Sequence, residues 1–309
     1  MLKTKCFPYN HLFFLFSHVF LAGLICVMIL LPDQKVAGSK FYFYVVIGMI
    51  ELLGIIQFFM KKGKKTVAGE ILSIIWCFFL WWELNVTKFD RMHPVLAPAP
   101  EKVFSALWSQ RYIHINNMVE SMKLLLTALV IGLGCAVLIG LICGWITRLG
   151  EILYPIAVVM TPIPAVVYAP YIIACMPSFR SASFAIVVIG VIFPNLLNMI
   201  TRVKSIDPSI LDAAYAMNIK GMALVLKVLL PYTLPSILSG LKVTVTTSIM
   251  LLLYAEMMGA TKGLGYYIVN YNTYGNYTNV IGGIIVIALT VTLLNRLAEW
   301  ISKHAIHWQ

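Results

Sequence analysis

Charged residues are scarce in this sequence: Asp, Glu, Lys and Arg together make up 11% of its 309 residues. An ordinary soluble domain has roughly a quarter of its residues charged, so this composition excludes one. Hydrophobic residues reach 61%, and the mean hydropathy is +0.89. Because each helical span of a bilayer needs about 20 apolar residues, the chain has room for about eight spans. We therefore expect an all-α, polytopic membrane protein with the lipid bilayer as one of its partners.

The motifs that would mark an enzyme or a bound cofactor are also missing. No GxxxxGK[ST] segment occurs, so the chain lacks the loop that cradles the phosphates of ATP. Its six cysteines include no CxxC pair, its six histidines are dispersed, and no Ser/His/Asp arrangement is visible. We expect no catalytic residue, no metal site and no cofactor on this chain.

Positive charge is in excess, with 23 Lys and Arg against 12 Asp and Glu. In a soluble protein this balance would suggest nucleic acid, but in a membrane protein it is typical of cytoplasmic loops that face anionic lipid. We therefore expect no nucleic acid partner. Lys61, Lys62, Lys64 and Lys65 fall together beside an apolar run, and the positive-inside rule places them, and with them both termini, in the cytoplasm.

Eight apolar runs are long enough to cross a membrane. The first follows Lys3 and Lys5, as a signal peptide would, but it ends in Leu31-Pro32-Asp33 without a small-residue cleavage site, which favours a retained helix. The predicted spans are residues 12–31, 41–60, 66–87, 122–147, 152–176, 181–201, 232–258 and 280–298.

Two polar stretches are too long to be simple turns. Residues 88–121 fall outside, where we expect an extended Pro-rich segment that leads into an amphipathic helix from about Glu101. Residues 202–231 fall in the cytoplasm, and they are the most informative part of the sequence.

The cytoplasmic stretch predicts a short helix that lies crosswise under the bundle. Asp207 is a candidate N-cap, Pro208 suits the first helical position, and Asn218 tolerates the left-handed conformation that ends a helix. A second helix then begins at Met222. The short helix has one apolar face of small residues, which suits either docking of another protein or simple anchoring at the lipid surface. The residues on this face are Ile210, Ala213, Ala214 and Met217.

At these residues the sequence resembles a known family. Asp212-Ala213-Ala214, followed at a fixed distance by Leu230-Pro231, looks like the EAA loop of bacterial ABC importer permeases, the element that docks on the ATPase subunit. The resemblance is closest to the nitrate/sulfonate/taurine branch, a binding-protein-dependent inner membrane component, and covers about residues 76–309. It continues through PIPAVVYAP (162–170), PSILSGLKV (235–243), AEMMGATKGLGYYI (255–268), and WEL (82–84) followed by LAPAPEKVFSAL (96–107).

The resemblance implies a type I ABC importer transmembrane domain in the bacterial inner membrane. Its six family spans would lie in residues 66–309, with the coupling loop at 202–231, and residues 1–65 would add two further helices. The implied partners are two ATPase subunits that carry ATP and Mg, an extracytoplasmic solute-binding protein and a second copy of this chain. Relatives in this branch carry anions and also neutral or cationic vitamin precursors. The implied ATPase-coupling residues are Asp212, Ala213, Ala214, Met217, Asn218 and Gly221.

The sequence departs from the family pattern at three places. Asp212 replaces the usual Glu with the same charge, and Asn218 replaces the usual Gly, which the left-handed conformation accommodates. Residues 176–183, MPSFRSAS, replace the pattern FGxGxxSK after the fifth span, so the outer gate cannot be transferred from the family.

Polar residues and prolines in the spans are candidates for a translocation path, because ionisable groups are costly in hydrocarbon unless they face water or a partner. Pro162, Pro164 and Pro170 should kink the fifth predicted span, either as part of a transport site or for structure alone. Glu256 could face the path together with Tyr254 and Thr246/Thr247 of the same helix, or could instead pair at the membrane interface or cap the following turn. The predicted path residues are Pro164, Tyr168, Tyr171, Thr247, Tyr254 and Glu256.

An ion-coupled secondary transporter is the alternative function. Such a protein would need no ATPase, but it would want charged sites near mid-membrane and often two related halves. The sequence has few mid-membrane charges and no second copy of the 202–231 loop, which disfavours this alternative. We expect the two polar residues of the second span, Glu51 and Gln57, to bond to a neighbouring helix or to extend toward the membrane surface rather than to contact the solute.

Overall fold

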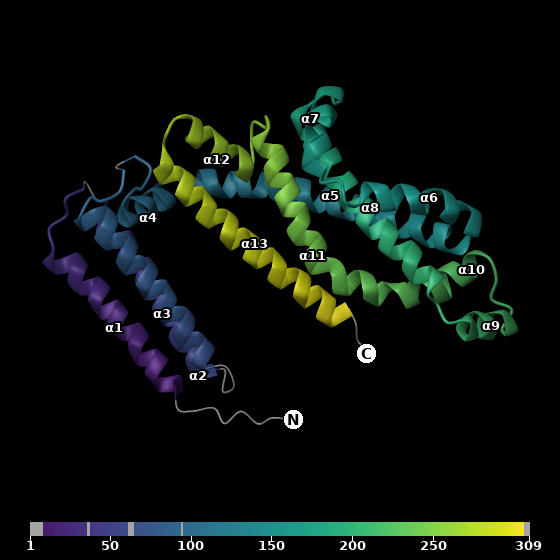
Figure 1. Ribbon diagram of the computed structural model, residues 1–309, viewed down its shortest axis with the longest axis horizontal. Helices are drawn as coiled ribbons and strands as arrows, with labels where there is room; N and C mark the ends of the chain where they lie inside the picture. Colours follow the sequence, from purple (N-terminus) through teal and green to yellow (C-terminus); the bar gives the residue numbers. More distant parts are fainter. Residues whose placement is uncertain (1–8, 36–37, 61–64, 94, 306–309) are drawn as a thin grey trace. The chain divides into compact units, whose positions relative to one another are not determined.

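The computed structural model describes residues 9–35, 38–60, 65–93 and 95–305, where every regular element is helical (Figure 1). The predicted all-α fold is confirmed for this part of the chain. The side chains of the lysine cluster at 61–65 lie outside the described residues. The elements are α1 (Tyr9–Leu30), α2 (Lys40–Met60), α3 (Lys65–Trp82), η1 (Glu83–Lys88), α4 (Pro100–Ser109), α5 (Arg111–Trp145), α6 (Thr147–Met160), α7 (Ala165–Cys175), α8 (Phe179–Lys204), α9 (Pro208–Ala216), α10 (Met222–Leu224), η2 (Val225–Leu229), α11 (Leu230–Met257), α12 (Leu264–Thr273) and α13 (Tyr277–Ala305).

Seven helical segments among the described residues are long and apolar enough to cross a membrane. The pair α6 and α7 gives an eighth if it counts as one span. This agrees with the expected count of about eight. The segment Met222–Met257 is helical throughout, so the helix predicted from Met222 continues directly into the seventh predicted span.

The fifth predicted span, 152–176, is broken rather than kinked. Helices α6 and α7 meet at an angle of 102°, with four residues between them. Pro162 and Pro164 explain the break, because each lacks a backbone N–H and its ring clashes with the preceding turn of a helix. Pro164 has the extended conformation of an N-cap, with φ −59° and ψ 132°, and starts α7 in a new direction.

Helix α5 is longer than the predicted span 122–147, because it begins at Arg111. Its first turns contain the polar residues Asn117 and Ser121, whose side chains bond to a turn elsewhere in the fold. The amphipathic helix expected from Glu101 is confirmed as α4, which has Pro100 at its first position. The outer polar stretch is therefore mostly helical.

The chain divides into two compact units. Unit 1 comprises Met1–Tyr112 and Asn270–Ile284, and unit 2 comprises Ile113–Val269 and Ile285–Gln309. In unit 1, α3 packs along α1, and α2 packs against α3 and α4. The interior of unit 1 is aromatic: Trp76 and Phe43 are fully buried, and the Phe43 ring stacks on Phe104 at 5.4 Å between centroids.

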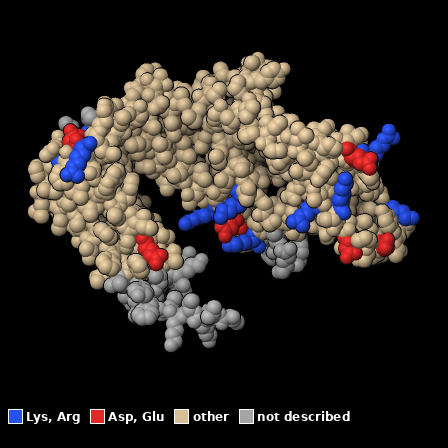
Figure 2. All heavy atoms as spheres, viewed as in Figure 1, with Lys and Arg blue, Asp and Glu red and all other residues tan. Residues whose placement is uncertain are grey.

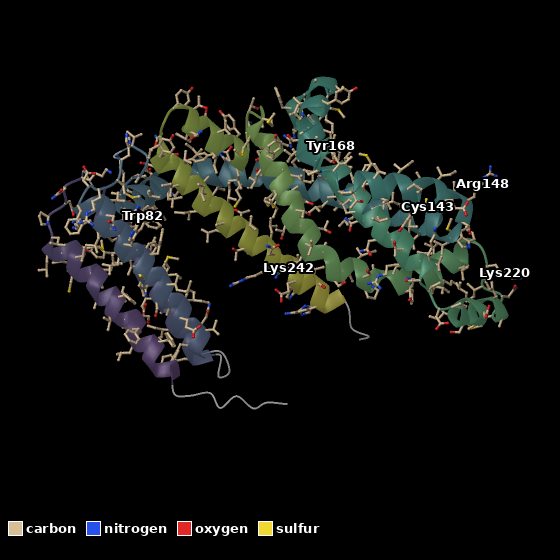
Figure 3. The ribbon with its side chains drawn as sticks, viewed as in Figure 1. Trp82, Cys143, Arg148, Tyr168, Lys220 and Lys242 are labelled. Carbon is tan, nitrogen blue, oxygen red and sulfur yellow. The ribbon has the colours of Figure 1, made fainter. Side chains whose placement is uncertain are left out.

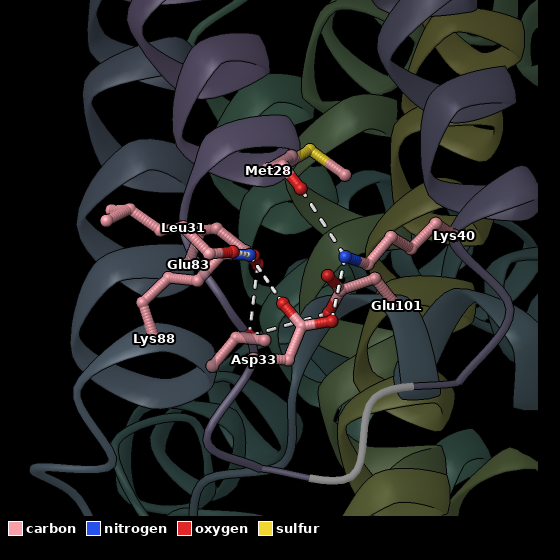
Figure 4. A network of polar contacts seen from close by, with 8 residues as sticks. Met28, Leu31, Asp33, Lys40, Glu83, Lys88 and Glu101 are labelled. Carbon is pink, nitrogen blue, oxygen red and sulfur yellow. Dashed lines mark hydrogen bonds and ion pairs between the residues drawn. The ribbon is translucent and has the colours of Figure 1, made fainter.

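A buried charged cluster joins the helix ends of unit 1 (Figure 4). Asp33, which follows α1, pairs with Lys40 of α2 at 2.7 Å and with Lys88 of η1. The ammonium of Lys88 also donates to the Leu31 carbonyl at 2.8 Å. Glu83, Lys88 and Glu101 are almost fully buried, so their charges are compensated inside the protein rather than by water.

Burial and the neighbouring Glu83 carboxylate raise the pKa of Glu101 to about 7. Partial burial acts to raise the pKa of Asp33, but hydrogen bonds from Lys40 and Lys88 outweigh it and hold that pKa below its ordinary value. A further acid of unit 1, Glu51, accepts from the Trp76 indole at 3.0 Å and pairs with His18 at 2.9 Å. The expected bond of Glu51 to a neighbouring helix is confirmed.

Unit 2 is built around α8, which packs against α6, α7 and α11. Its main apolar cluster contains Leu125 and Ala128 of α5, Val187 of α8, and Ile249 and Leu252 of α11. Helices α5 and α8 approach closely, since a Cβ at Gly140 would collide with Met199 of α8. Small residues at such contacts are the usual means of helix packing in membranes. Helix α8 therefore connects α9, which follows it in the chain, with α7 and α11. These elements carry most of the predicted site residues.

Candidate functional site

The short helix predicted within residues 202–231 forms as α9. The Asp207 carboxylate accepts from the Ser209 backbone N–H at 2.9 Å, and Pro208 stands at the first helical position. Hydrogen bonding from the Ser209 side chain, and then from this N–H, lowers the pKa of Asp207. Helix α9 thus starts by a local rule that needs no partner from the rest of the fold.

The end of α9 also follows the prediction. Asn218 has φ +57°, the left-handed conformation. Its N–H donates to the Tyr215 carbonyl at 2.9 Å, and the Ile219 N–H donates to the Ala214 carbonyl at 2.9 Å. This pair of bonds is the Schellman motif, which satisfies the last carbonyls of a helix. Gly221, with φ +60°, then turns the chain into α10.

Most of the predicted apolar face of α9 is exposed. Ala214 is 2% exposed, whereas Ile210 is 38% and Met217 is 68% exposed, and Ala213 is also open to solvent. Leu211 packs against a cluster that includes Val203 and Val225, so the helix is attached to the ends of α8 and η2. The face that was predicted as one apolar stripe therefore has one buried residue, Ala214, and is otherwise exposed.

Helix α9 lies at one end of unit 2, well separated from α7 (Figure 1). Figure 3 places Lys220 next to it and Arg148 in the first turn of α6 at the same end. In Figure 2 the visible face carries few charged side chains, and one group of them gathers over this end. The charge is mixed, because Asp207 and Asp212 of the same loop are exposed beside Lys220.

A cavity of about 800 Å³ lies among α7, α8 and α11. Four of the six predicted path residues line it: Pro164, Tyr168, Thr247 and Tyr254. Figure 3 shows Tyr168 where α7 meets α8. The other two do not line it, since Tyr171 is 75% exposed elsewhere on α7 and Glu256 belongs to a different site.

The broken span helps to build this cavity. Its wall includes Met160 and Thr161 at the end of α6 and Pro164 to Val166 at the start of α7. Discontinuous helices with their ends at a cavity are common at transport sites. The cavity also contains Asn195 and Asn198 of α8, which sequence reasoning missed. Their spacing of three residues within an apolar helix was the available signal, because it places two amides on one face.

Glu256 closes the turn between α11 and α12. It is 3% exposed, and its carboxylate accepts from the Ser121 hydroxyl at 2.6 Å and from the Gly265 N–H at 2.8 Å. Ser121 accepts in turn from the Leu264 N–H at 2.9 Å, and the Asn117 amide oxygen accepts from the Gly263 N–H at 2.9 Å. The alternative in which Glu256 caps the following turn is the arrangement that the structure has.

The motif around this turn is shaped to admit the carboxylate. Gly263 has φ +121°, and a Cβ there would collide with the Glu256 carboxylate. A Cβ at Gly265 would collide with the Leu253 carbonyl. The segment AEMMGATKGLGYYI therefore forms a clasp of Glu256, Ser121, Asn117 and the N–H groups of residues 263–265, which we call the outer clasp.

The substituted segment MPSFRSAS forms a helix start. The Ser178 hydroxyl accepts from the Ser181 N–H and the Ser181 hydroxyl accepts from the Ser178 N–H, each at 3.2 Å, which is a capping box for α8. Arg180 in the next turn pairs with Glu120 of α5 at 3.1 Å. Among the described residues, no group of three His, Cys, Asp or Glu side chains is arranged to hold a metal.

Comparison with known proteins identifies the family. The sequence pattern of the family described as "Binding-protein-dependent transport system inner membrane component" matches residues 136–306. The chain belongs to this family. It is a multi-pass membrane protein, and the matched region includes α9, the cavity and the outer clasp, except for residues of α5 before 136.

Its relatives are permease proteins. A putative ABC transporter permease of Methanocaldococcus jannaschii is 27% identical over 74% of this chain and 87% of its own length. The taurine transport system permease protein TauC of Escherichia coli is 24% identical over 79% of this chain and 91% of its own. The nitrate import permease protein NrtB of Leptolyngbya laminosa is 28% identical over 54% of this chain and 60% of its own.

A solved structure of the MetNI methionine ABC transporter has the same fold. It matches with a TM-score of 0.56 and 18% identity over 63% of this chain and 97% of its own. This likeness confirms the predicted fold, that of a type I ABC importer transmembrane domain. The membership in the nitrate/sulfonate/taurine branch is likewise supported, since nitrate, sulfonate, taurine and formylaminopyrimidine permeases are among the relatives.

Proposed function

We propose that this chain works as the permease of an ATP-driven importer in a bacterial cell membrane. Two copies line one path, two separate ATPase subunits carry ATP and Mg, and an extracytoplasmic binding protein delivers the solute. The family match and the permease relatives support this proposal. The excess of Lys and Arg near residues 61–65 supports cytoplasmic termini.

Helix α9 is the proposed contact with the ATPase. The observation that supports this contact is that Leu211 anchors α9 to the ends of α8 and η2 and Ala214 is buried, while Ala213 and Met217 remain exposed. A push on the open surface therefore reaches α8 and α11 as a rigid-body movement. Asp212, Asn218 and Gly221 complete the predicted contact set.

The cavity among α7, α8 and α11 is the proposed part of the path within this chain. Pro164, Tyr168, Thr247 and Tyr254 keep their predicted role, because they line it. Glu256 is assigned to the outer clasp instead, since its oxygens are engaged by Ser121 and Gly265. The cavity contains no acidic side chain of the kind that an ion-coupled transporter uses.

The proposal is tested by Ala213→Arg. Ala213 is exposed, so the chain should fold and insert normally, while a long cation on the contact surface should abolish ATP-dependent uptake. Copurification with the ATPase and uptake by the reconstituted complex measure the effect. Ala213→Ser is the matched control and should keep both.

If Ala213→Arg copurified with the ATPase and transported at the normal rate, α9 would not be the contact. If the unmodified chain accumulated solute on an ion gradient without any ATPase, the alternative of a secondary transporter would hold.

A further inference from the structure

The wall of the cavity among α7, α8 and α11 has no ionised side chain. Its lining consists of aliphatic residues, Phe193, four prolines and glycines, and a few amides and hydroxyls, with no Lys, Arg, His, Asp or Glu among the described residues. Charged residues of unit 2 lie elsewhere, for example Arg180 at the start of α8 and Glu120 of α5. A solute in the cavity therefore meets no counter-charge.

The ends of the broken span formed by α6 and α7 do not supply a counter-charge either. The last turn of α6 presents backbone carbonyls with partial negative charge, and the first turn of α7 presents N–H groups with partial positive charge. Residues of both ends line the same cavity, so the partial charges beside it are of opposite sign, and neither end supplies a full counter-charge.

Three polar side chains in the cavity are free to bond a solute. Thr247 donates to the Val243 and Thr244 carbonyls, and Asn195 donates to the Val191 carbonyl, so these groups are already engaged. The Asn198 amide and the hydroxyls of Tyr168 and Tyr254 make no hydrogen bond with any described residue. Figure 3 shows Tyr168 at the contact between α7 and α8, where the cavity lies.

Bringing an ion into such a cavity without a partner costs several kcal/mol in a low-dielectric site. An uncharged solute with apolar or aromatic surface and a few hydrogen-bonding atoms pays no such cost, and it gains contact with the tyrosine rings.

We propose that the solute that crosses through this cavity is uncharged at neutral pH and hydrogen-bonds through amide or heteroatom groups to Asn198, Tyr168 and Tyr254. This inference rests on the proposed function, because it names the substrate class of that path. It separates this chain from relatives whose names specify nitrate or sulfonates, which are anions.

The test uses the complex of this chain with its ATPase and binding protein, reconstituted in liposomes. The probe is a small-molecule extract of cells, and mass spectrometry identifies what accumulates with internal ATP and not without it. An accumulated compound that is uncharged at pH 7 supports the inference. An accumulated anion, cation or zwitterion overturns it and leaves the proposed function intact, whereas no ATP-dependent accumulation at all overturns the proposed function.

A pair of variants tests the role of the cavity amide. Asn198→Leu removes a free amide, and uptake of the accumulated compound should fall about tenfold, the effect of one lost hydrogen bond. Asn85→Leu makes the same change in η1 of unit 1, away from this cavity, and should leave uptake unchanged. Equal uptake by Asn198→Leu and the unmodified chain would overturn the assignment of Asn198 as a solute contact.

Discussion

The outer clasp and the cavity of unit 2 use the same kinds of polar group in opposite ways. In the clasp, Glu256, Ser121 and Asn117 are engaged by one another or by backbone N–H groups. In the cavity, the Asn198 amide and the Tyr254 hydroxyl have no partner among the described residues. Polar groups that are closed on each other stabilise the fold, whereas those left open are available to a solute.

The largest expected effect is in the clasp. Glu256→Ala leaves the Gly265 N–H and the Ser121 hydroxyl without their buried acceptor, so the free energy of unfolding should fall by about 3 kcal/mol. Thermal unfolding in detergent measures the change. The control is Glu299→Ala, which removes an exposed pair with Lys303 and should leave thermal unfolding nearly unchanged. Equal losses in the two variants would contradict the structural role of the clasp.

The charged cluster of unit 1 extends the comparison, because it is buried like the clasp but leaves one oxygen of Glu83 and one of Glu101 without a hydrogen-bond partner. The pKa of Glu101 is about 7 in the folded chain and near its ordinary value of 4.5 in the unfolded chain. Between these values the folded chain holds a proton that the unfolded chain has released, so stability falls as the pH rises through this window.

Titration of Glu101 should therefore lower the free energy of unfolding by about 2 kcal/mol from pH 5 to pH 8, and Glu101→Gln should make this pH dependence shallower. Unfolding curves of the full chain at pH 5, 6, 7 and 8 measure it. Asp33, with its lowered pKa, contributes only below this range. A pH slope that is the same in Glu101→Gln would show that another group titrates.

The smallest expected effect on stability comes from a comparison of two hydroxyl groups, one in the cavity and one in the outer clasp. Tyr254→Phe removes a hydroxyl that has no partner in the described part of the chain, so stability should change by less than about 0.5 kcal/mol. Ser121→Ala removes a hydroxyl that both donates and accepts in the clasp, and should cost about 1–2 kcal/mol. Equal losses of stability in Tyr254→Phe and Ser121→Ala would contradict the distinction between the cavity and the outer clasp.

Local rules made α9 predictable from the sequence. Asp207, Pro208 and Asn218 act through their own backbone neighbours, and the structure has each of them as predicted. The broken span was predicted only as a kink, because Pro162 and Pro164 specify an interruption but not the 102° direction that packing on α8 gives to α7.

The sequence pattern could not predict contacts between residues that are far apart in the chain. Whether Glu256 faces the path or caps a turn depends on Ser121, which lies 135 residues earlier in the chain. Four of the six predicted path residues line one cavity because α7, α8 and α11 pack together there. The exposure of Ala213 follows in the same way from which side of α9 meets Val203 and Val225.

The most direct test of the account is solute accumulation by liposomes that contain this chain, with and without its ATPase subunit. The account predicts accumulation only when the ATPase, the binding protein and ATP are all present, and loss of accumulation in Ala213→Arg. Accumulation by this chain alone on a proton or sodium gradient would contradict it.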